Sequence, residues 1–183
     1  MKTIIQKLSY LFILIGYVSF AQDLTITNGT SLTLVSGTDF YVNGINFNPS
    51  NNLALTGPLE FSKTATPVGE SIDRVFNFSN PITNFTGEVT FYYDDSDLLP
   101  TSASESSLVL RVKDGTTWSG DLEPTRDGNL NTLIYNFPSS TSISSITASK
   151  PGILLSINKF NQLKINLFPN PVISSFKINT RCQ

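Results

Sequence analysis

The ten residues Asp39–Asn48 constrain the fold more than any other stretch of this 183-residue chain. Within them, Asn43-Gly44 separates two alternating runs, and such a pair favours a type I′ turn because both central residues need a positive φ. Tyr41 and Asn46 then point to one face of the hairpin. A two-residue loop places four apolar side chains on the opposite face: Phe40, Val42, Ile45 and Phe47. The segment therefore predicts a β-hairpin with one buried side and one exposed side.

Short alternating apolar runs continue along the chain and are separated by turn residues. After residue 64 the pattern predicts six strands: Val75–Phe78, Gly87–Tyr93, Ser107–Lys113, Thr116–Ser119, Thr132–Phe137 and Ile143–Ala148. The turns predicted between them are Ser79-Asn80-Pro81, Asp94–Pro100, Asp114-Gly115 and Arg126–Gly128. Many short strands with regular turns are typical of an antiparallel β-sandwich.

We therefore expect an all-β chain in four parts. Residues 1–21 are a signal peptide, and residues 22–64 form a hairpin and meander or a few rungs of a β-solenoid. Residues 65–150 form an antiparallel β-sandwich, and residues 151–183 form a short extended tail. Apolar side chains of matching parity predict the core of the sandwich: Val89, Phe91, Tyr93, Leu108, Leu110, Val112, Leu133, Tyr135 and Phe137.

Composition excludes several classes of function. The chain has no histidine and a single cysteine, Cys182, so it holds no intramolecular disulfide, no Cys/His zinc site and no histidine-dependent triad. Between residues 22 and 149 there are fourteen acidic and five basic residues, a formal charge of −9. An acidic body argues against nucleic acid as a partner.

The N-terminus has the pattern of a secretory signal. Lys2 and Lys7 precede an apolar run that ends at Phe20, and small residues stand at Ser19 and Ala21. We expect signal peptidase to cleave between Ala21 and Gln22. The alternative is a membrane anchor, but the run of about thirteen residues is shorter than the roughly 20 that a spanning helix needs.

A stiff motif precedes the last strand-like run of the chain. In Phe168-Pro169-Asn170-Pro171, two prolines fix φ twice, and the residue before each proline is pushed to extended geometry. The run Val172–Ile178 then alternates as a half-buried strand does. The alternative interpretation is a polar tail that the two prolines interrupt.

This motif with its following strand resembles the start of the type A C-terminal sorting domain of the type IX secretion system, a cargo tag of Gram-negative gliding bacteria and their relatives. The resemblance covers Leu167 to about Thr180. It implies export to the outer cell surface or the medium, with the type IX export machinery as a partner. The family's tag continues through further strands to a basic end, so we expect either a truncated tag here or a tag that continues beyond Gln183.

One carboxylate cluster is a candidate metal site. Asp94, Asp95 and Asp97 lie within four residues, with Glu105 downstream, and calcium prefers several carboxylate oxygens. The alternative is a solvated turn between strands, because the glycine and glutamate of an EF-hand are missing. A glycosidase pair would need one buried acid, which so polar a loop does not indicate, so we expect no enzyme.

Four aromatic residues are candidates for stacking on sugars: Tyr41, Tyr92, Tyr93 and Trp118. Tyr41 and Tyr92 have the outward parity in the predicted strands, whereas a lone tryptophan in a sandwich usually belongs to the core.

The leading hypothesis is a secreted or cell-surface type IX cargo whose non-catalytic β-module is structural or adhesive, with an extracellular glycan or surface partner. The alternatives are a carbohydrate-binding module of a polysaccharide-processing protein and a calcium-stabilised adhesin repeat. We expect no obligatory cofactor, calcium being the one candidate.

Overall fold

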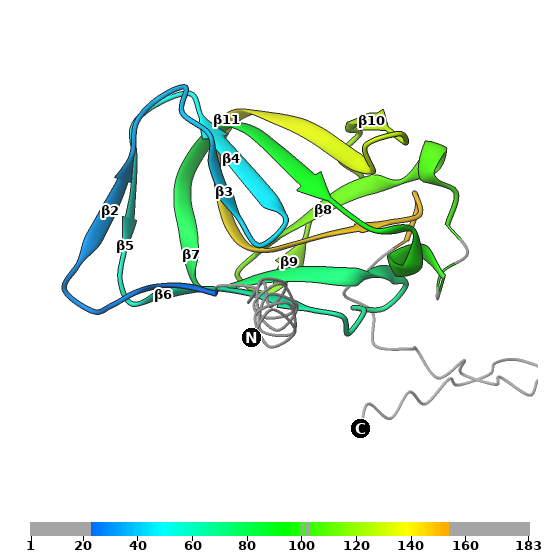
Figure 1. Ribbon diagram of the computed structural model, residues 1–183, viewed down its shortest axis with the longest axis horizontal. Helices are drawn as coiled ribbons and strands as arrows, with labels where there is room; N and C mark the ends of the chain where they lie inside the picture. The colour runs from blue at the N-terminus through cyan, green and yellow to red at the C-terminus, as the bar shows by residue number, and fades with distance from the viewer. Residues whose placement is uncertain (1–22, 100, 102, 154–183) are drawn as a thin grey trace, which may run out of the picture.

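The structure, a computed structural model, describes residues 23–153 apart from residues 100 and 102 (Figure 1). The predicted cleavage point at Ala21 and Gln22 and the Phe168–Pro171 motif lie outside the described residues. The described strands are β1 Leu24–Ile26, β2 Ser31–Leu34, β3 Phe40–Val42, β4 Ile45–Pro49, β5 Leu53–Thr56, β6 Leu59–Thr64, β7 Ser71–Tyr92, β8 Val109–Asp114, β9 Thr117–Trp118, β10 Thr125–Asp127 and β11 Thr132–Ser149. Two short 3-10 helices, η1 Asp95–Leu98 and η2 Glu105–Ser107, complete the described elements. The expectation of an all-β fold is confirmed.

Two long strands, β7 and β11, lie at the centre of the main sheet. β7 and β11 pair antiparallel from Thr132 opposite Tyr92 to Ser149 opposite Ser71, with register shifts between Phe137 and Ser149. The shifts divide this ribbon into two parts, each of which carries further strands. The first half-sheet has the order β3-β4-β7-β11-β10, and the second has the order β1-β6-β7-β11-β8-β9.

The two half-sheets pack face to face, as in a sandwich. The ring of Phe76, from the start of β7, lies 5.3 Å from that of Phe91, from its end, in an edge-to-face contact. Phe47 on β4 contacts Phe78 and Phe61 across the same interior at 5.9 and 6.3 Å. Edge-to-face aromatic pairs of this kind stabilise a core beyond the area that they bury.

The predicted hairpin is confirmed in its register. β3 and β4 pair Phe40 with Phe47 and Val42 with Ile45, and the turn residues Asn43 and Gly44 have φ values of 53° and 102°. Every strand pair among the described residues is antiparallel, which favours the meander over the few-rung solenoid for residues 22–64. β2 and β5 form a separate two-stranded sheet, called here the wing, at one end of the molecule (Figure 1).

The predicted turn at Ser79-Asn80-Pro81 is wrong, because these residues lie inside the continuous strand β7. The chain bends there without reversing: the register with β11 shifts after Asn77, and Asn84 and Gly87 adopt positive φ. Turn-forming residues at such a shift act as a bulge that carries the strand from one half-sheet to the other. The two runs predicted within residues 132–148 are joined into β11 in the same way.

The core lies between the half-sheets. Eight of the nine predicted core residues are buried, and Tyr135 is partly buried against them. Strands β1 to β6 contribute to the same cluster, through Ile45 and Phe61 among others, and β6 is hydrogen-bonded to β7. The loop of residues 65–70 thus joins two paired strands. Within residues 23–153 as described, no helix is long and apolar enough to cross a membrane.

Candidate functional site

A groove of about 1170 Å³ opens between the β3–β4 hairpin, the N-terminal end of β1, the end of β7 and the turn between β10 and β11. We call it the tyrosine groove. The lining side chains that the following argument uses are Tyr41, Asn43, Tyr92, Asp94, Leu130 and Asn131. It therefore combines the two candidate features of the sequence, the outward tyrosines and the acidic loop.

The hairpin turn fixes one wall of the groove. The carbonyl of Gly44 accepts a hydrogen bond of 3.1 Å from the backbone N–H of Tyr92, which holds the turn against the end of β7. Gly44 has a φ of 102°, and a Cβ there would lie 3.3 Å from Nη1 of Arg74. Glycine is favoured at this position by the backbone conformation, and the close approach of the arginine side chain adds to the cost of a larger residue.

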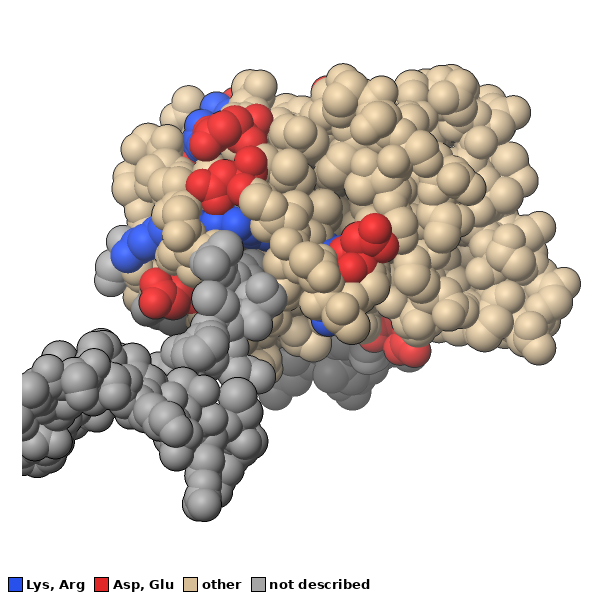
Figure 2. Space-filling view, turned by 180° about the vertical axis from the view of Figure 1, so that it is seen from behind, with Lys and Arg blue, Asp and Glu red and all other residues tan. Residues whose placement is uncertain are grey.

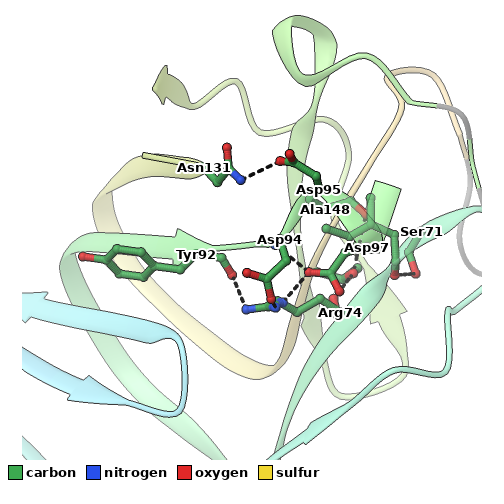
Figure 3. A network of polar contacts seen from close by, with 10 residues as sticks. Ser71, Arg74, Tyr92, Asp94, Asp95, Asp97, Asn131 and Ala148 are labelled. Carbon is green, nitrogen blue, oxygen red and sulfur yellow. Dashed lines mark hydrogen bonds and ion pairs between the residues drawn. The ribbon is translucent and has the colours of Figure 1, made fainter. Parts of the chain in front are cut away.

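Arg74 is buried at the base of the groove and organises the acidic loop (Figure 3). Its Nη2 pairs with Asp94, its Nε donates to Oδ2 of Asp97 at 2.6 Å, and its Nη1 donates to the carbonyl of Tyr92 at 3.0 Å. The same Oδ2 of Asp97 accepts the backbone N–H of Asp94 at 2.8 Å, at the start of η1. A guanidinium with several fixed donors thus determines where the loop after β7 lies.

Two asparagines on the rim are oriented by carboxylates. Nδ2 of Asn43 donates to Oδ1 of Asp23 at 3.1 Å. Nδ2 of Asn131 donates to Oδ1 of Asp95 at 2.7 Å, as Figure 3 shows. Each asparagine has one amide oxygen with two acceptor positions, and its amide nitrogen is engaged on the protein. The rim therefore offers positioned acceptors for hydroxyl groups.

Exposed apolar surface lines the same groove. The Tyr41 side chain is 62% exposed, and its ring meets that of Tyr92 edge to face with centroids 5.6 Å apart. In Figure 3 the ring of Tyr92 points away from the arginine network. Leu130, on the turn that faces the hairpin, is 69% exposed. The outward parity predicted for Tyr41 agrees with its position.

Tyr93 has the opposite orientation and is buried. Burial and the nearby carboxylates of Glu105, Asp95 and Asp127 raise the pKa of the Tyr93 phenol to about 12. Both causes favour the neutral form, because a phenolate would be desolvated and would face like charges. Tyr93 is thus a structural neighbour of the acidic loop and does not present its face to a ligand.

The three aspartates of the candidate calcium site do not converge on one point. Asp94 and Asp97 pair with Arg74, whereas Asp95 accepts from Asn131. Of the residues that the structure describes, no group of three or more acidic, cysteine or histidine side chains is placed to hold a metal ion. The guanidinium occupies the position between two of the carboxylates at which a cation would be expected.

Neither Trp118 nor Glu105 lines the tyrosine groove. Trp118 is half-buried on β9, opposite Lys113 of β8, and does not line the groove. Glu105 begins η2 and lies near Tyr93 and Gly128. Of the four candidate stacking residues, the structure therefore brings together Tyr41 and Tyr92.

The role of Arg74 in the site was not predicted from the sequence, although its position in the strand gives an indication of it. Arg74 alternates in step with Ile72 and Phe76, both of which are buried, so a charged residue occupies a core-facing position. A buried arginine needs carboxylate partners, and Asp94 and Asp97 form the densest acidic cluster of the chain. The rim residues Asn43, Leu130 and Asn131 belong to turns and carry no comparable signal.

No family model matches the chain, and neither the comparison with curated proteins nor that with solved structures gives a match.

Proposed function

We propose that the chain is a secreted or cell-surface cargo of the type IX route whose β-module works by adhesion. The partners in export are signal peptidase and the type IX machinery, and the destination is the outer surface or surroundings of a Gram-negative bacterium. The proposal for export rests on the signal pattern before Gln22 and on the Phe168–Pro171 motif.

The observation that supports adhesion is the tyrosine groove. A non-catalytic binding module needs an exposed patch of apolar and hydrogen-bonding groups on a rigid scaffold. Tyr41 and Leu130 are exposed at the mouth of such a scaffold, and the nearby carboxylates of Asp94 and Asp97 are held by Arg74. Carboxylates committed to ion pairs favour a binding role over an acid–base role.

A carbohydrate-binding module is the second candidate, and the pairing of Tyr41 with Tyr92 favours it. The calcium-stabilised adhesin repeat has less support, because Asp94 and Asp97 already neutralise a cation of the protein.

Export is tested by producing the chain in a Gram-negative host that has the type IX machinery. The expected result is protein at the surface or in the medium that begins at Gln22, as mass spectrometry of its N-terminal peptide would show. Replacing Pro169 and Pro171 together by alanine should retain the protein inside the outer membrane. The matched control is Pro151→Ala, which changes a proline outside the motif and should leave export unchanged.

Recovery of the protein inside the cell with residues 1–21 attached would contradict the proposal. So would normal export of the Pro169/Pro171 double variant. Adhesion is tested separately, by measuring retention of the purified protein on surfaces coated with extracellular polysaccharide and on uncoated surfaces.

A further inference from the structure

Charge balance in the tyrosine groove limits the kind of ligand that it suits. The lining contains two carboxylates, Asp23 and Asp94, and two cations, Lys63 and Arg74. Asp94 pairs with Arg74, and the charge of Asp23 is matched in number by that of Lys63, so the lining side chains carry no net charge. A site for an anionic or cationic polymer would instead carry a surplus of opposite charge.

Size and shape of the groove suit a chain of linked units. Its volume of about 1170 Å³ exceeds the roughly 300–1,000 Å³ of pockets that enclose a small molecule. It runs between structural elements far apart in sequence, with Asp23 and Leu24 on one side and Asn129, Leu130 and Asn131 on another. An extended ligand could therefore contact several of these elements at once.

The chemistry of the lining suits a ligand with apolar faces and hydroxyl edges. Tyr41 offers an exposed ring held from one side by Tyr92, so little side-chain freedom is lost when a flat partner stacks on it. Asn43 and Asn131 offer amide oxygens whose orientation is set by hydrogen bonds to carboxylates. Sugar rings have this combination of an apolar face and hydroxyl donors at the rim.

We propose that the tyrosine groove binds an uncharged oligosaccharide chain, with Tyr41 stacking on a sugar ring and with Asn43 and Asn131 accepting its hydroxyl protons. This inference rests on the proposed adhesive function and specifies the ligand class of the same site. Tyr92 acts as a positioning residue, because it supports the ring of Tyr41 and its backbone N–H holds the Gly44 turn.

The test uses purified protein and isothermal titration calorimetry with four uncharged hexasaccharides, built from glucose, mannose, galactose or xylose. A hexamer of galacturonic acid is the anionic comparison. We expect at least one uncharged hexamer to bind and the anionic hexamer to bind at least tenfold more weakly. Tyr41→Ala should weaken binding by about tenfold or more, as loss of a central aromatic contact does, and Tyr41→Phe should restore it to within about twofold.

Val35→Ala is the matched control, because Val35 is 56% exposed and lies outside the groove lining. Its binding should equal that of the parent protein. Thermal unfolding of each variant establishes that Tyr41→Ala remains folded, as expected for a side chain that is mostly exposed.

Three outcomes would overturn the inference: no binding by any uncharged hexamer, equal or tighter binding of the anionic hexamer, or binding that Tyr41→Ala leaves unchanged. Binding of an uncharged extended peptide without any oligosaccharide binding would also overturn it. Failure of the inference can be told apart from failure of the proposed function. A protein that is exported and adheres equally well with Tyr41→Ala keeps the proposed function and contradicts only the ligand inference, whereas one that binds hexamers but is not exported contradicts only the export part of the proposed function.

Discussion

The wing and the arginine end of this molecule are stabilised by different kinds of interaction. We define the arginine end as Arg74, Arg111 and Arg126 with the carboxylates that pair with them. The strands of the wing, β2 and β5, contain no charged residue and bury three leucines, Leu34, Leu53 and Leu55. Figure 2 shows the same contrast at the surface: charged side chains gather toward one end, and the other end is almost uncharged on that face.

The two regions differ in the interactions that determine their local structure. A hydrophobic contact is non-directional, so the wing depends on the alternation of its strands to set which face is buried. The arginine end holds irregular loops, where directional bonds replace a ladder. Arg111 is 1% exposed, pairs with Asp121, and donates to the hydroxyl of Ser149 and the carbonyl of Ser119. One buried guanidinium thereby joins β8, β11 and the loop after β9.

Leu55→Ala should produce the largest loss of stability, and it should be centred on the wing. Leu55 is buried, so its truncation leaves a cavity and should lower the free energy of unfolding by about 3 kcal/mol. Urea denaturation measures the loss, and hydrogen exchange should show faster exchange in β2 and β5 before the arginine end. Leu32→Ala, opposite Leu55 in the ladder but partly exposed, is the control and should cost less than about 1 kcal/mol. Uniform acceleration of exchange throughout the protein would show that the wing is not a separate unit.

Asp121→Ala should have the next largest effect, at the arginine end. Removing the partner of a buried Arg111 leaves an uncompensated charge, and the partial exposure of Asp121 reduces the cost to about 2 kcal/mol. Glu123→Ala is the matched control: it removes the exposed partner of Arg126 and should change stability by less than about 1 kcal/mol. Equal losses for the two variants in urea denaturation would remove the distinction between the fully buried Arg111 and the partly buried Arg126.

Alkaline pH should weaken the arginine end through Tyr93. Its pKa is about 12 in the folded protein and about 10 in an unfolded chain, so the unfolded state loses its proton first. This contribution to stability is therefore complete below pH 10 and is lost as the pH rises through 12. Denaturation at pH 8 and pH 11 should show a smaller decrease for Tyr93→Phe than for the parent protein. A decrease of the same size in both would contradict the shift.

Acidic pH should have the smallest effect, near the hairpin and away from the arginine end. Hydrogen bonds from Asn46 and then Asn48 lower the pKa of the exposed Asp39 below 3.8. The contribution of Asp39 is present above that value and is lost as the pH falls through the lower, folded-state pKa. Nuclear magnetic resonance titration of the Asp39 carboxyl measures the shift directly. Replacing both asparagines by alanine should return the pKa towards 3.8, and an unchanged pKa would contradict this cause.

Local chemistry was sufficient to predict the hairpin and most of the core. Asn43-Gly44 fixed the turn, and the turn fixed which residues face each other, so the register followed from sequence alone. The continuity of β7 and β11 could not be predicted in this way. Ser79-Asn80-Pro81 has the composition of a turn, and only pairing with β11 determines that the chain continues through a bend.

The candidate site likewise contains some features that local sequence predicts and others that depend on tertiary packing. Exposure of Tyr41 followed from its parity in the hairpin, whereas its contact with Tyr92 depends on packing between strands 51 residues apart in sequence. The aspartates after β7 were recognised as a cluster, but their cation is a side chain of β7 itself. The alternation of β7 indicates that Arg74 faces inward. The sequence alone does not show that β7 bends and brings Arg74 next to Tyr92, because that bend depends on packing with the rest of the fold.

The long β7–β11 ribbon has a consequence for the order in which the molecule can assemble. β11 is hydrogen-bonded to β7, β8 and β10, and its last residue, Ser149, pairs with the first residue of β7, Ser71. These three strands therefore remain without one of their partners until β11, the last of the described strands, has been synthesised. Closing such large loops before their contacts form slows folding. A chain synthesised from its N-terminus therefore stays incompletely folded until β11 has been made, and its earlier strands expose unpaired edges until then.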